Sequence, residues 1–218
     1  MRRILFAFIV LVVGSPVLAE PVFVENHSFE ADFAAPGTFP VFVPQGWTVT
    51  DPNNILDFNT DAVGVLNPTG TTYFTPDAPT DGSNAALIYL AGDIGGGPVG
   101  LMQTLGTQLQ PNTHYTLQVD VGNIAAGFGT GPFADIYFEL SGFPGYTVQL
   151  LAGDLLLAED ANTLTIDDGQ WGTSVVEFTT GETLPIENAF LQVHVTNLNQ
   201  IDTPELPGIE VDFDNVRL

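Results

Sequence analysis

The sequence predicts an all-β protein, a two-sheet antiparallel jelly-roll sandwich, and three observations support this fold class. The 23 glycines and 16 prolines interrupt the 218-residue chain too often for long helices. Segments between them alternate apolar and polar residues with a period of two. Neither a linker nor an internal repeat of about 20–50 residues divides the chain, which favours a single domain over residues 20–218.

Three segments carry the clearest strand pattern, each expected to have one face on a core and one in water. In residues 113–122 (THYTLQVDVG) the apolar side chains fall on alternate positions, and the same holds for residues 134–140 and 190–196. The apolar faces comprise Tyr115, Leu117, Val119 and Val121; Ile136, Phe138 and Leu140; and Leu191, Val193 and Val195. Further strands are expected at 21–29, 39–50, 84–91, 98–106, 145–151, 154–159, 173–180 and 209–218.

Two segments are less regular. The stretch 154–164 (DLLLAEDANTL) is compatible with a helix, although its first half favours a strand. Residues 53–81 are rich in turn residues and only weakly patterned, so we expect them to form loops over one face or rim of the sandwich and to carry recognition.

Residues 1–19 are predicted to be a secretory signal peptide. Arg2 and Arg3 precede an apolar run from Ile4 to Val13, and Val17 and Ala19 suit a small-residue cleavage site. The run is shorter than the roughly 20 residues that span a membrane, which makes a retained anchor the weaker alternative. The mature protein is therefore expected to start at Glu20 and to be secreted, extracellular or periplasmic.

Charge excludes several classes of partner. Once Arg2 and Arg3 are removed, only Arg217 remains against 26 acidic residues, so the formal charge is 1 − 26 = −25. Such a polyanion binds neither nucleic acid nor anionic membrane surfaces directly. Solubility, including solubility in a saline habitat, is an alternative explanation for the bulk acidity. With no cysteine, stability must come from a core or a metal.

The C-terminal stretch GIEVDFDNVRL places three carboxylates on one face of a predicted strand. Glu210, Asp212 and Asp214 alternate with apolar residues, and the alternation changes parity around Asp214–Asn215. A β-bulge produces such a change and re-aims a side chain. We expect Glu210 simply to face solvent.

Several phrases together resemble galactose-binding-like jelly-roll domains, including carbohydrate-binding modules and secreted domains of bacterial PEP-CTERM proteins. They are VENHSFEAD, PQGWTV, DGSNAALIYL, LMQTLGTQLQPNTHYTLQVDVGN, GQWGTSVVEFTT and VDFDNVRL, and GYTVQLLAGDLLLA is similar to the PEP-CTERM group. The sorting tail of that group is missing from the sequence, so the resemblance implies a released protein.

The resemblance implies a structural calcium ion held by Glu30 and Asp214, with Asp212 joining directly or through water. Asp81 or Ser83 would contribute from a nearby turn. Carboxylates and backbone carbonyls are the oxygen ligands that Ca²⁺ prefers.

Catalysis has little support from the residues themselves. The three histidines are far apart in the sequence, and neither a cysteine nor a nucleophile-elbow motif is present. Aromatic side chains are the remaining candidates, because sugar rings stack on them. Trp47 and Trp171 are expected to be packing residues, whereas a binding rim is predicted at Tyr73, Phe74, Phe128 and Phe133.

These patterns favour a secreted, non-enzymatic, Ca²⁺-stabilised module that binds carbohydrate or another extracellular matrix polymer. Two alternatives stay open. One is a secreted carbohydrate-active hydrolase with carboxylates on the concave face of the sandwich, and the other is a structural surface or biofilm protein without a small ligand.

Overall fold

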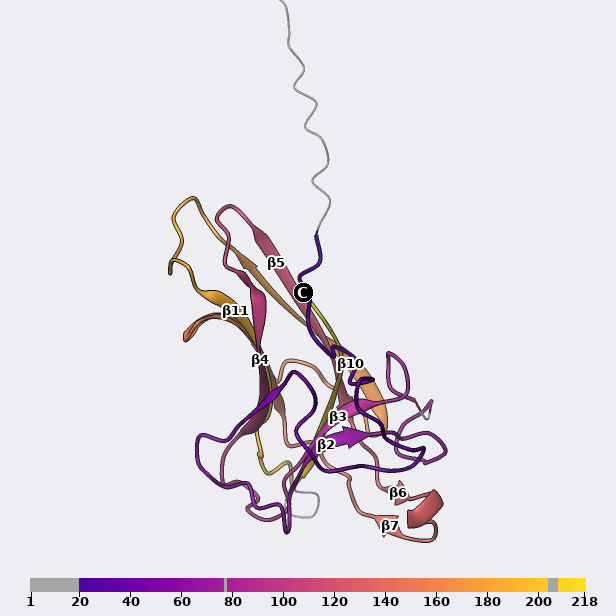
Figure 1. The fold of residues 1–218 in the computed structure, drawn as a ribbon. Helices are drawn as coiled ribbons and strands as arrows, with labels where there is room; N and C mark the ends of the chain where they lie inside the picture. The colour runs from indigo at the N-terminus through magenta and orange to yellow at the C-terminus, as the bar shows by residue number, and fades with distance from the viewer. Residues whose placement is uncertain (1–19, 77, 204–207) are drawn as a thin grey trace, which may run out of the picture.

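The computed structural model describes residues 20–76, 78–203 and 208–218, so the predicted signal peptide lies outside the described residues. Two five-stranded antiparallel sheets face each other and form two layers (Figure 1), which confirms the predicted all-β sandwich. Val22 donates its backbone N–H to the carbonyl of Leu218 at 2.7 Å. The start of the described chain and the C-terminus therefore lie side by side.

The first sheet, called the β11 sheet, has the strand order β1-β4-β11-β8-β9. Its strands are β1 (Thr48–Thr50), β4 (Val99–Gln108), β11 (Phe190–Asn197), β8 (Tyr146–Ala152) and β9 (Leu155–Ala161). The second, called the β12 sheet, has the order β10-β5-β12-β3-β2. Its strands are β10 (Gln170–Thr179), β5 (His114–Asn123), β12 (Glu210–Arg217), β3 (Ala85–Tyr89) and β2 (Ala62–Leu66).

A small additional unit projects from one end of the sandwich, at the lower right of Figure 1. It pairs β6 (Gly127–Phe128) with β7 (Tyr137–Phe138), and the 3-10 helix η1 (Gly131–Phe133) connects them. Among the described residues, no helix has the length and apolar character needed to cross a membrane.

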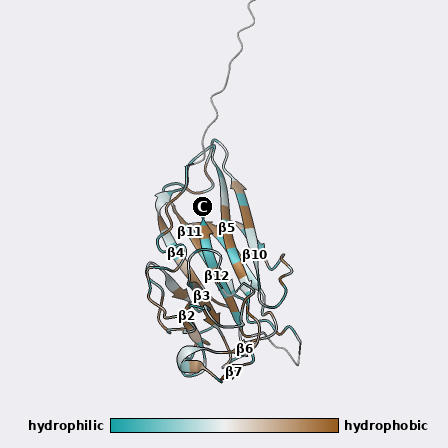
Figure 2. Ribbon diagram, turned by 90° about the vertical axis from the view of Figure 1, so that its right-hand side faces the viewer, coloured by the Kyte–Doolittle hydropathy of each residue, from teal (hydrophilic) through white to brown (hydrophobic). Residues whose placement is uncertain are grey.

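The main core lies between the two sheets, where the alternating apolar side chains of both meet. Leu117, Val119 and Val121 from β5 are fully buried, as are Val193 and Val195 from β11. This confirms the predicted inward faces of both strands. Figure 2 shows the alternation of hydrophilic and hydrophobic residues along the strands of the β12 sheet.

Several predicted strands are shorter than expected or lie elsewhere. Residues 21–29 form no strand and include a turn at 25–28, and of 39–50 only β1 and an isolated bridge at Val41 pair as strands. In 134–140 only β7 is extended, and Ile136 is 48% exposed because this segment passes over the end of the sandwich. Conversely, β2 lies inside the stretch predicted to be loops.

The predicted bulge near the C-terminus is confirmed. Asp214 pairs with Asp120 of β5, and the register shifts before Arg217. Asn215 takes a left-handed conformation with φ of 52°, which Asn tolerates well. Because of this extra residue, Phe213 and Val216 both reach the main core.

Candidate functional site

A second, smaller core covers the outer face of the β12 sheet. On β3, Ala86 and Ile88 point into the main core, whereas Leu87 and Tyr89 point outward into the second one. Loop residues before β2, between β2 and β3, and after β5 cover this face. They contribute Phe39, Tyr73, Phe74, Ile124, Phe138 and Leu140.

A cavity of about 240 Å³ lies within this second core. Four aromatic rings form much of its wall, and two carboxyl groups, those of Asp61 and Glu210, also line it. The aromatic residues are Phe39, Tyr73, Tyr89 and Phe138. An apolar cavity with a few polar groups is the usual form of a small-molecule site.

Glu210 lies on β12, directly across from Tyr89 of β3. It is only 5% exposed, and Asp212 is completely buried. The expectation that Glu210 faces solvent was therefore wrong. The physical reason is that β12 is the central strand of its sheet and that loops cover its outer face, which alternation along one strand cannot reveal.

Asp212 lies beside Glu210 on the same face, between Leu87 of β3 and Gly122 of β5. Its carboxyl oxygens have no hydrogen-bond partner apart from the Glu210 carboxyl group, with which a protonated Asp212 can share a hydrogen bond. A methyl group on Gly122 would lie 2.9 Å from the Trp171 ring and 3.1 Å from Phe74, so glycine lets these rings close over the strand. Asp212 is thus sealed from water.

Burial favours the protonated form of both carboxyl groups. Desolvation raises the pKa of Glu210 to about 8. Desolvation also raises the pKa of Asp212 well above its ordinary value, and the neighbouring Glu210 adds to this effect. Desolvation and the Glu210 charge raise the pKa of Tyr73 to about 12.

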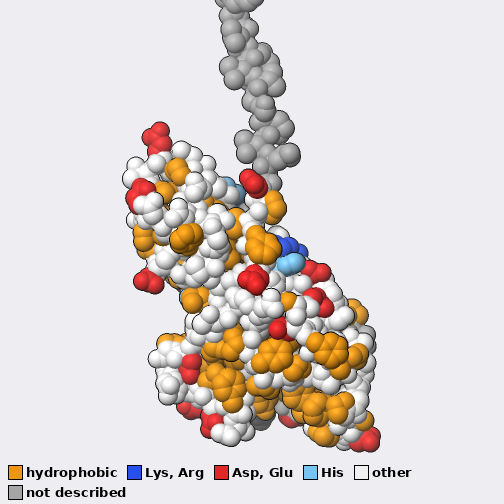
Figure 3. Space-filling model, in the orientation of Figure 1, with side chains coloured by type: hydrophobic (Ala, Val, Ile, Leu, Met, Phe, Trp, Pro, Cys, Tyr) orange, Lys and Arg blue, Asp and Glu red, His pale blue; other side chains and the backbone are white. Residues whose placement is uncertain are grey.

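Cations are too few to neutralise this pair. In the described ranges Arg217 is the sole lysine or arginine, so the blue atoms on the surface in Figure 3 belong to it. Its guanidinium donates to Asp120 at 3.3 Å, away from the cavity. Protonation is therefore the remaining way to avoid two buried negative charges.

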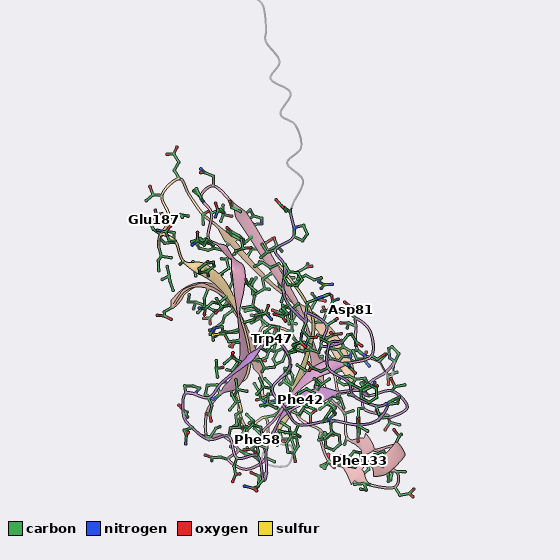
Figure 4. All side chains as sticks on the ribbon, in the orientation of Figure 1. Phe42, Trp47, Phe58, Asp81, Phe133 and Glu187 are labelled. Carbon is green, nitrogen blue, oxygen red and sulfur yellow. The ribbon has the colours of Figure 1, made fainter. Side chains whose placement is uncertain are left out.

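The first loop of the predicted aromatic rim is buried rather than exposed, although Tyr73 lines the cavity, and its role in binding stays a prediction. Tyr73 and Phe74 are 3% and 2% exposed, because the loop that carries them folds inward over the β12 sheet. In the second loop Phe128 is 56% exposed and meets Tyr137 edge-on, as expected for a rim residue. Phe133 is half-buried and stacks on Phe39, with ring centroids 4.7 Å apart; Figure 4 shows it in the projecting unit.

Both tryptophans are packing residues, as predicted. Trp47 is 5% exposed and packs against Phe29 in the main core, and Figure 4 shows it in the middle of the molecule. Trp171 stacks on Phe74, with ring centroids 4.7 Å apart.

The two main residues predicted to bind calcium meet at one turn. Glu30 accepts the backbone N–H groups of Ser83 and Asn84, each at 2.6 Å. Asp214 accepts the backbone N–H of Asp81 at 2.7 Å. Asp212, the third predicted ligand, lies instead beside Glu210.

The structure offers partial support for an ion at that turn. Burial raises the pKa of Asp214 to about 7, and the side-chain oxygen of Asn84 is buried without a hydrogen-bond partner. These oxygens suit a hard cation. Among the described residues, however, no group of three or more histidine, cysteine, aspartate or glutamate side chains is arranged to hold a metal. Calcium binding stays a prediction.

A second hollow, of about 470 Å³, lies against the outer face of the β11 sheet. Its lining includes Thr147, Gln149, His194 and Thr196, all polar. None of the unpartnered buried polar atoms in the described residues lies there. The aromatic cavity, which Glu210 lines and beside which Asp212 is buried, is therefore the stronger candidate for chemistry.

An aromatic cavity lined by a few acidic side chains is typical of proteins that bind a small, largely apolar molecule. The family model described as HpiC1-like, HpiC1 cyclase, matches residues 20–218. The Stig cyclase Fisc from Fischerella sp. TAU, in complex with (3Z)-3-(1-methyl-2-pyrrolidinylidene)-3H-indole, is 35% identical with a TM-score of 0.77, over 91% of this chain and 96% of that one. The chain belongs to the HpiC1-like cyclase family.

A second structure of a cyclase from Fischerella sp. TAU, in complex with 4-(1H-indol-3-yl)butan-2-one, is also 35% identical. It covers 91% of this chain and 96% of its own, with a TM-score of 0.75. An arabinose-bound MgGH51 α-L-arabinofuranosidase is 13% identical with a TM-score of 0.53, over 90% of this chain and 26% of its own, and shares the fold alone. No curated protein sequence matches the chain.

These relatives correct three expectations. The resemblance to galactose-binding-like and carbohydrate-binding domains named the wrong family, although it led to the right fold. The prediction of a non-enzymatic module was wrong, because the family is one of cyclases. The predicted carbohydrate or matrix partner was also wrong, since the related cyclases are seen with small indole compounds.

The sequence did hold one clue to the missed site. In the stretch AALIYL of β3, apolar residues occupy consecutive positions. Such a run is typical of a strand that is buried on both faces. It indicates a covered outer face, and hence that Glu210 and Asp212 on the neighbouring strand are buried.

Proposed function

We propose that this protein is a cyclase that closes a ring in an indole-bearing small molecule, using the Glu210–Asp212 pair as its acid. The observation that carries this proposal is the position of Glu210 at an aromatic cavity, with Asp212 buried beside it and no cationic partner for either carboxyl group. The indole class is suggested by the compounds bound to the two related cyclases.

The first step is a proton transfer. The O–H bond of the carboxyl group breaks and a C–H bond forms at the most electron-rich ring carbon, leaving a carboxylate and a cation on the substrate. A tethered double bond then supplies the electron pair for a new C–C bond. Loss of a proton to the carboxylate restores the acid, so the reaction needs no oxidant or reductant.

The cavity supports this chemistry in two ways. Aromatic faces attract a cation, and Tyr73, Tyr89 and Phe138 offer such faces around the space. The covering loops also bury Tyr73, Phe74 and Glu210, which limits the access of water that would otherwise capture the cation before the ring closes.

Proton exchange tests the proposal without the natural substrate. With 2-methylindole in D₂O, protonation at C3 replaces the ring hydrogen with deuterium, and the loss of its NMR signal is measured. We expect the protein to accelerate this loss. Glu210→Gln and Asp212→Asn should reduce the acceleration by about 10²-fold or more, the usual contribution of a positioned acid.

Glu177→Gln is the matched control, because Glu177 has a largely exposed side chain on β10 and lies outside the cavity. It should leave the exchange rate unchanged. If the wild type binds 2-methylindole without accelerating exchange, or if all three variants exchange like the wild type, the acid role is wrong.

We also propose that the protein is secreted after cleavage behind Ala19 and that Glu30 and Asp214 share a structural calcium ion. The first proposal rests on the N-terminal pattern of residues 1–19. The second is supported by the shared turn and the unpartnered Asn84 oxygen. In that place the ion would fasten the ends of the chain to the turn that precedes β3.

A further inference from the structure

Asp61 is a second acidic residue of the cavity, and the proposed proton transfer does not use it. It directly precedes β2 and is 5% exposed. Its Oδ1 accepts the backbone N–H groups of Ala91 at 2.9 Å and Gly92 at 2.7 Å. Its Oδ2 accepts the backbone N–H of Asp57 at 2.9 Å.

These contacts set Asp61 apart from the Glu210–Asp212 pair. Three N–H donors converge on Asp61, whereas no N–H group donates to either oxygen of Asp212. An ionised carboxylate only accepts hydrogen bonds, so three N–H donors suit the carboxylate form of Asp61. Its two oxygens have about four acceptor positions, and three are used, which leaves capacity to face a ligand.

The two kinds of carboxyl group lie on either side of one aromatic residue. Tyr89 of β3 pairs with Glu210 of β12 on one side and with Ala62, the neighbour of Asp61, on the other. Asp61 and Glu210 both line the same cavity. An occupant in contact with the Tyr89 ring would therefore lie between a proton donor and a fixed anion.

We propose that Asp61 is the counter-ion of this cavity and that the site is built to hold a cationic nitrogen heterocycle. This inference rests on the proposed function, because a cation arises there only if the occupant is protonated. Environments that differ in this way commonly divide the roles of two carboxyl groups between acid and electrostatic stabiliser.

The physical advantage comes from preorganisation. A carboxylate held by backbone donors does not have to reorient when positive charge develops on the occupant. Its electrostatic attraction for that charge is also stronger in a site with little water than in bulk solvent. Aromatic walls alone provide a weaker attraction for a cation. Asp61 thereby favours the protonated state of the occupant over its neutral form.

Binding of two probes of similar shape tests this role. The cation 1,2,3,3-tetramethyl-3H-indolium and neutral 1,2,3-trimethylindole are compared by calorimetry, and the ratio of their Kd values is measured. We expect the wild type to bind the cation at least about tenfold more tightly. Asp61→Asn should remove most of this preference.

Two controls separate this inference from the acid role. Glu210→Gln should abolish proton exchange yet keep the preference for the cation. Asp154→Asn makes the same change of charge at an exposed side chain between β8 and β9, outside the cavity, and it should keep both properties. If Asp61→Asn does not fold, Asp61→Ser, which keeps an oxygen acceptor for Ala91 and Gly92, takes its place.

Equal binding of both probes by the wild type overturns the proposal, whichever variants fold. A preference that survives in the Asp61 variant also overturns it. A preference lost in Glu210→Gln alone assigns the counter-ion to Glu210 and likewise refutes a role for Asp61. If proton exchange is absent but the preference for the cationic probe is present and depends on Asp61, only the acid role is refuted.

Discussion

Replacing Glu210 with glutamine should change how stability depends on pH. The pKa of Glu210 in the folded protein is about 8, against an ordinary value of 4.5. A group whose pKa is raised by folding stabilises the protein below its unfolded pKa, and this contribution is lost as pH rises through the folded pKa. The loss should therefore fall between about pH 4.5 and about pH 8.

The size of the effect follows from this difference of about 3.5 pH units. Each unit corresponds to about 1.4 kcal/mol, so ionising Glu210 costs on the order of 5 kcal/mol of unfolding free energy. Water entering the cavity at high pH would reduce this figure. Glutamine cannot ionise, so relative to the wild type Glu210→Gln should gain stability as pH rises.

Urea unfolding at pH 5, 6, 7 and 8 measures this difference. Asp212, Asp61, Tyr73 and Tyr89 also face the site, and of these Asp212 is expected to retain a pH dependence in the single variant. Adding Asp212→Asn to Glu210→Gln should weaken the remaining dependence of the unfolding free energy on pH. If wild type and Glu210→Gln lose stability in parallel across this range, Glu210 does not carry a buried proton and the reasoning fails.

Four further outcomes are expected. Trp47→Ala should lower the unfolding free energy by about 3–5 kcal/mol in urea titrations, because it empties an aromatic site in the main core. Free calcium at a hundredfold excess over Kd should stabilise the wild type by about 2.7 kcal/mol. Asp214→Asn should lose most of that response at matched ionic strength, and an identical response would exclude the shared site. Intact mass of secreted protein should show a chain that starts at Glu20, and a chain still starting at Met1 would contradict processing. Phe128→Ala should leave calorimetric binding of 4-(1H-indol-3-yl)butan-2-one nearly unchanged, since Phe128 does not line the cavity; a loss above about tenfold would place the ligand elsewhere.

The strands that form the main core could be predicted because their pattern is local. In β5 and β11 each buried residue alternates with a polar one, and a strand imposes that period whatever lies around it. The bulge at Asn215 was predictable for the same reason, since one extra residue changes the parity of the pattern. The alternation over 134–140 was misleading, because only the two residues of β7 pair there, with β6, and Ile136 is exposed.

The site could not be predicted in the same way. Tyr73 and Phe74 lie in a segment rich in turn residues, and nothing local distinguishes a loop that folds inward from one that projects into water. Their burial depends on Trp171 and Gly122, about 50 to 100 residues away in the sequence, which receive the ring of Phe74. Loop packing of this kind is a property of the assembled sheet.

By itself, the sequence determined the fold class, the absence of disulfides and an almost complete lack of cations, because composition and period are fixed before the chain folds. Only the tertiary structure decided what the carboxylates of the last strand do. It placed β12 in the centre of a sheet, covered Glu210 and Asp212 with aromatic loops, and aimed three backbone N–H groups at Asp61. The environment of a carboxyl group depends on water and on donors brought from distant segments, so Glu210 is desolvated at one wall of the cavity whereas Asp61 accepts three backbone N–H groups at another.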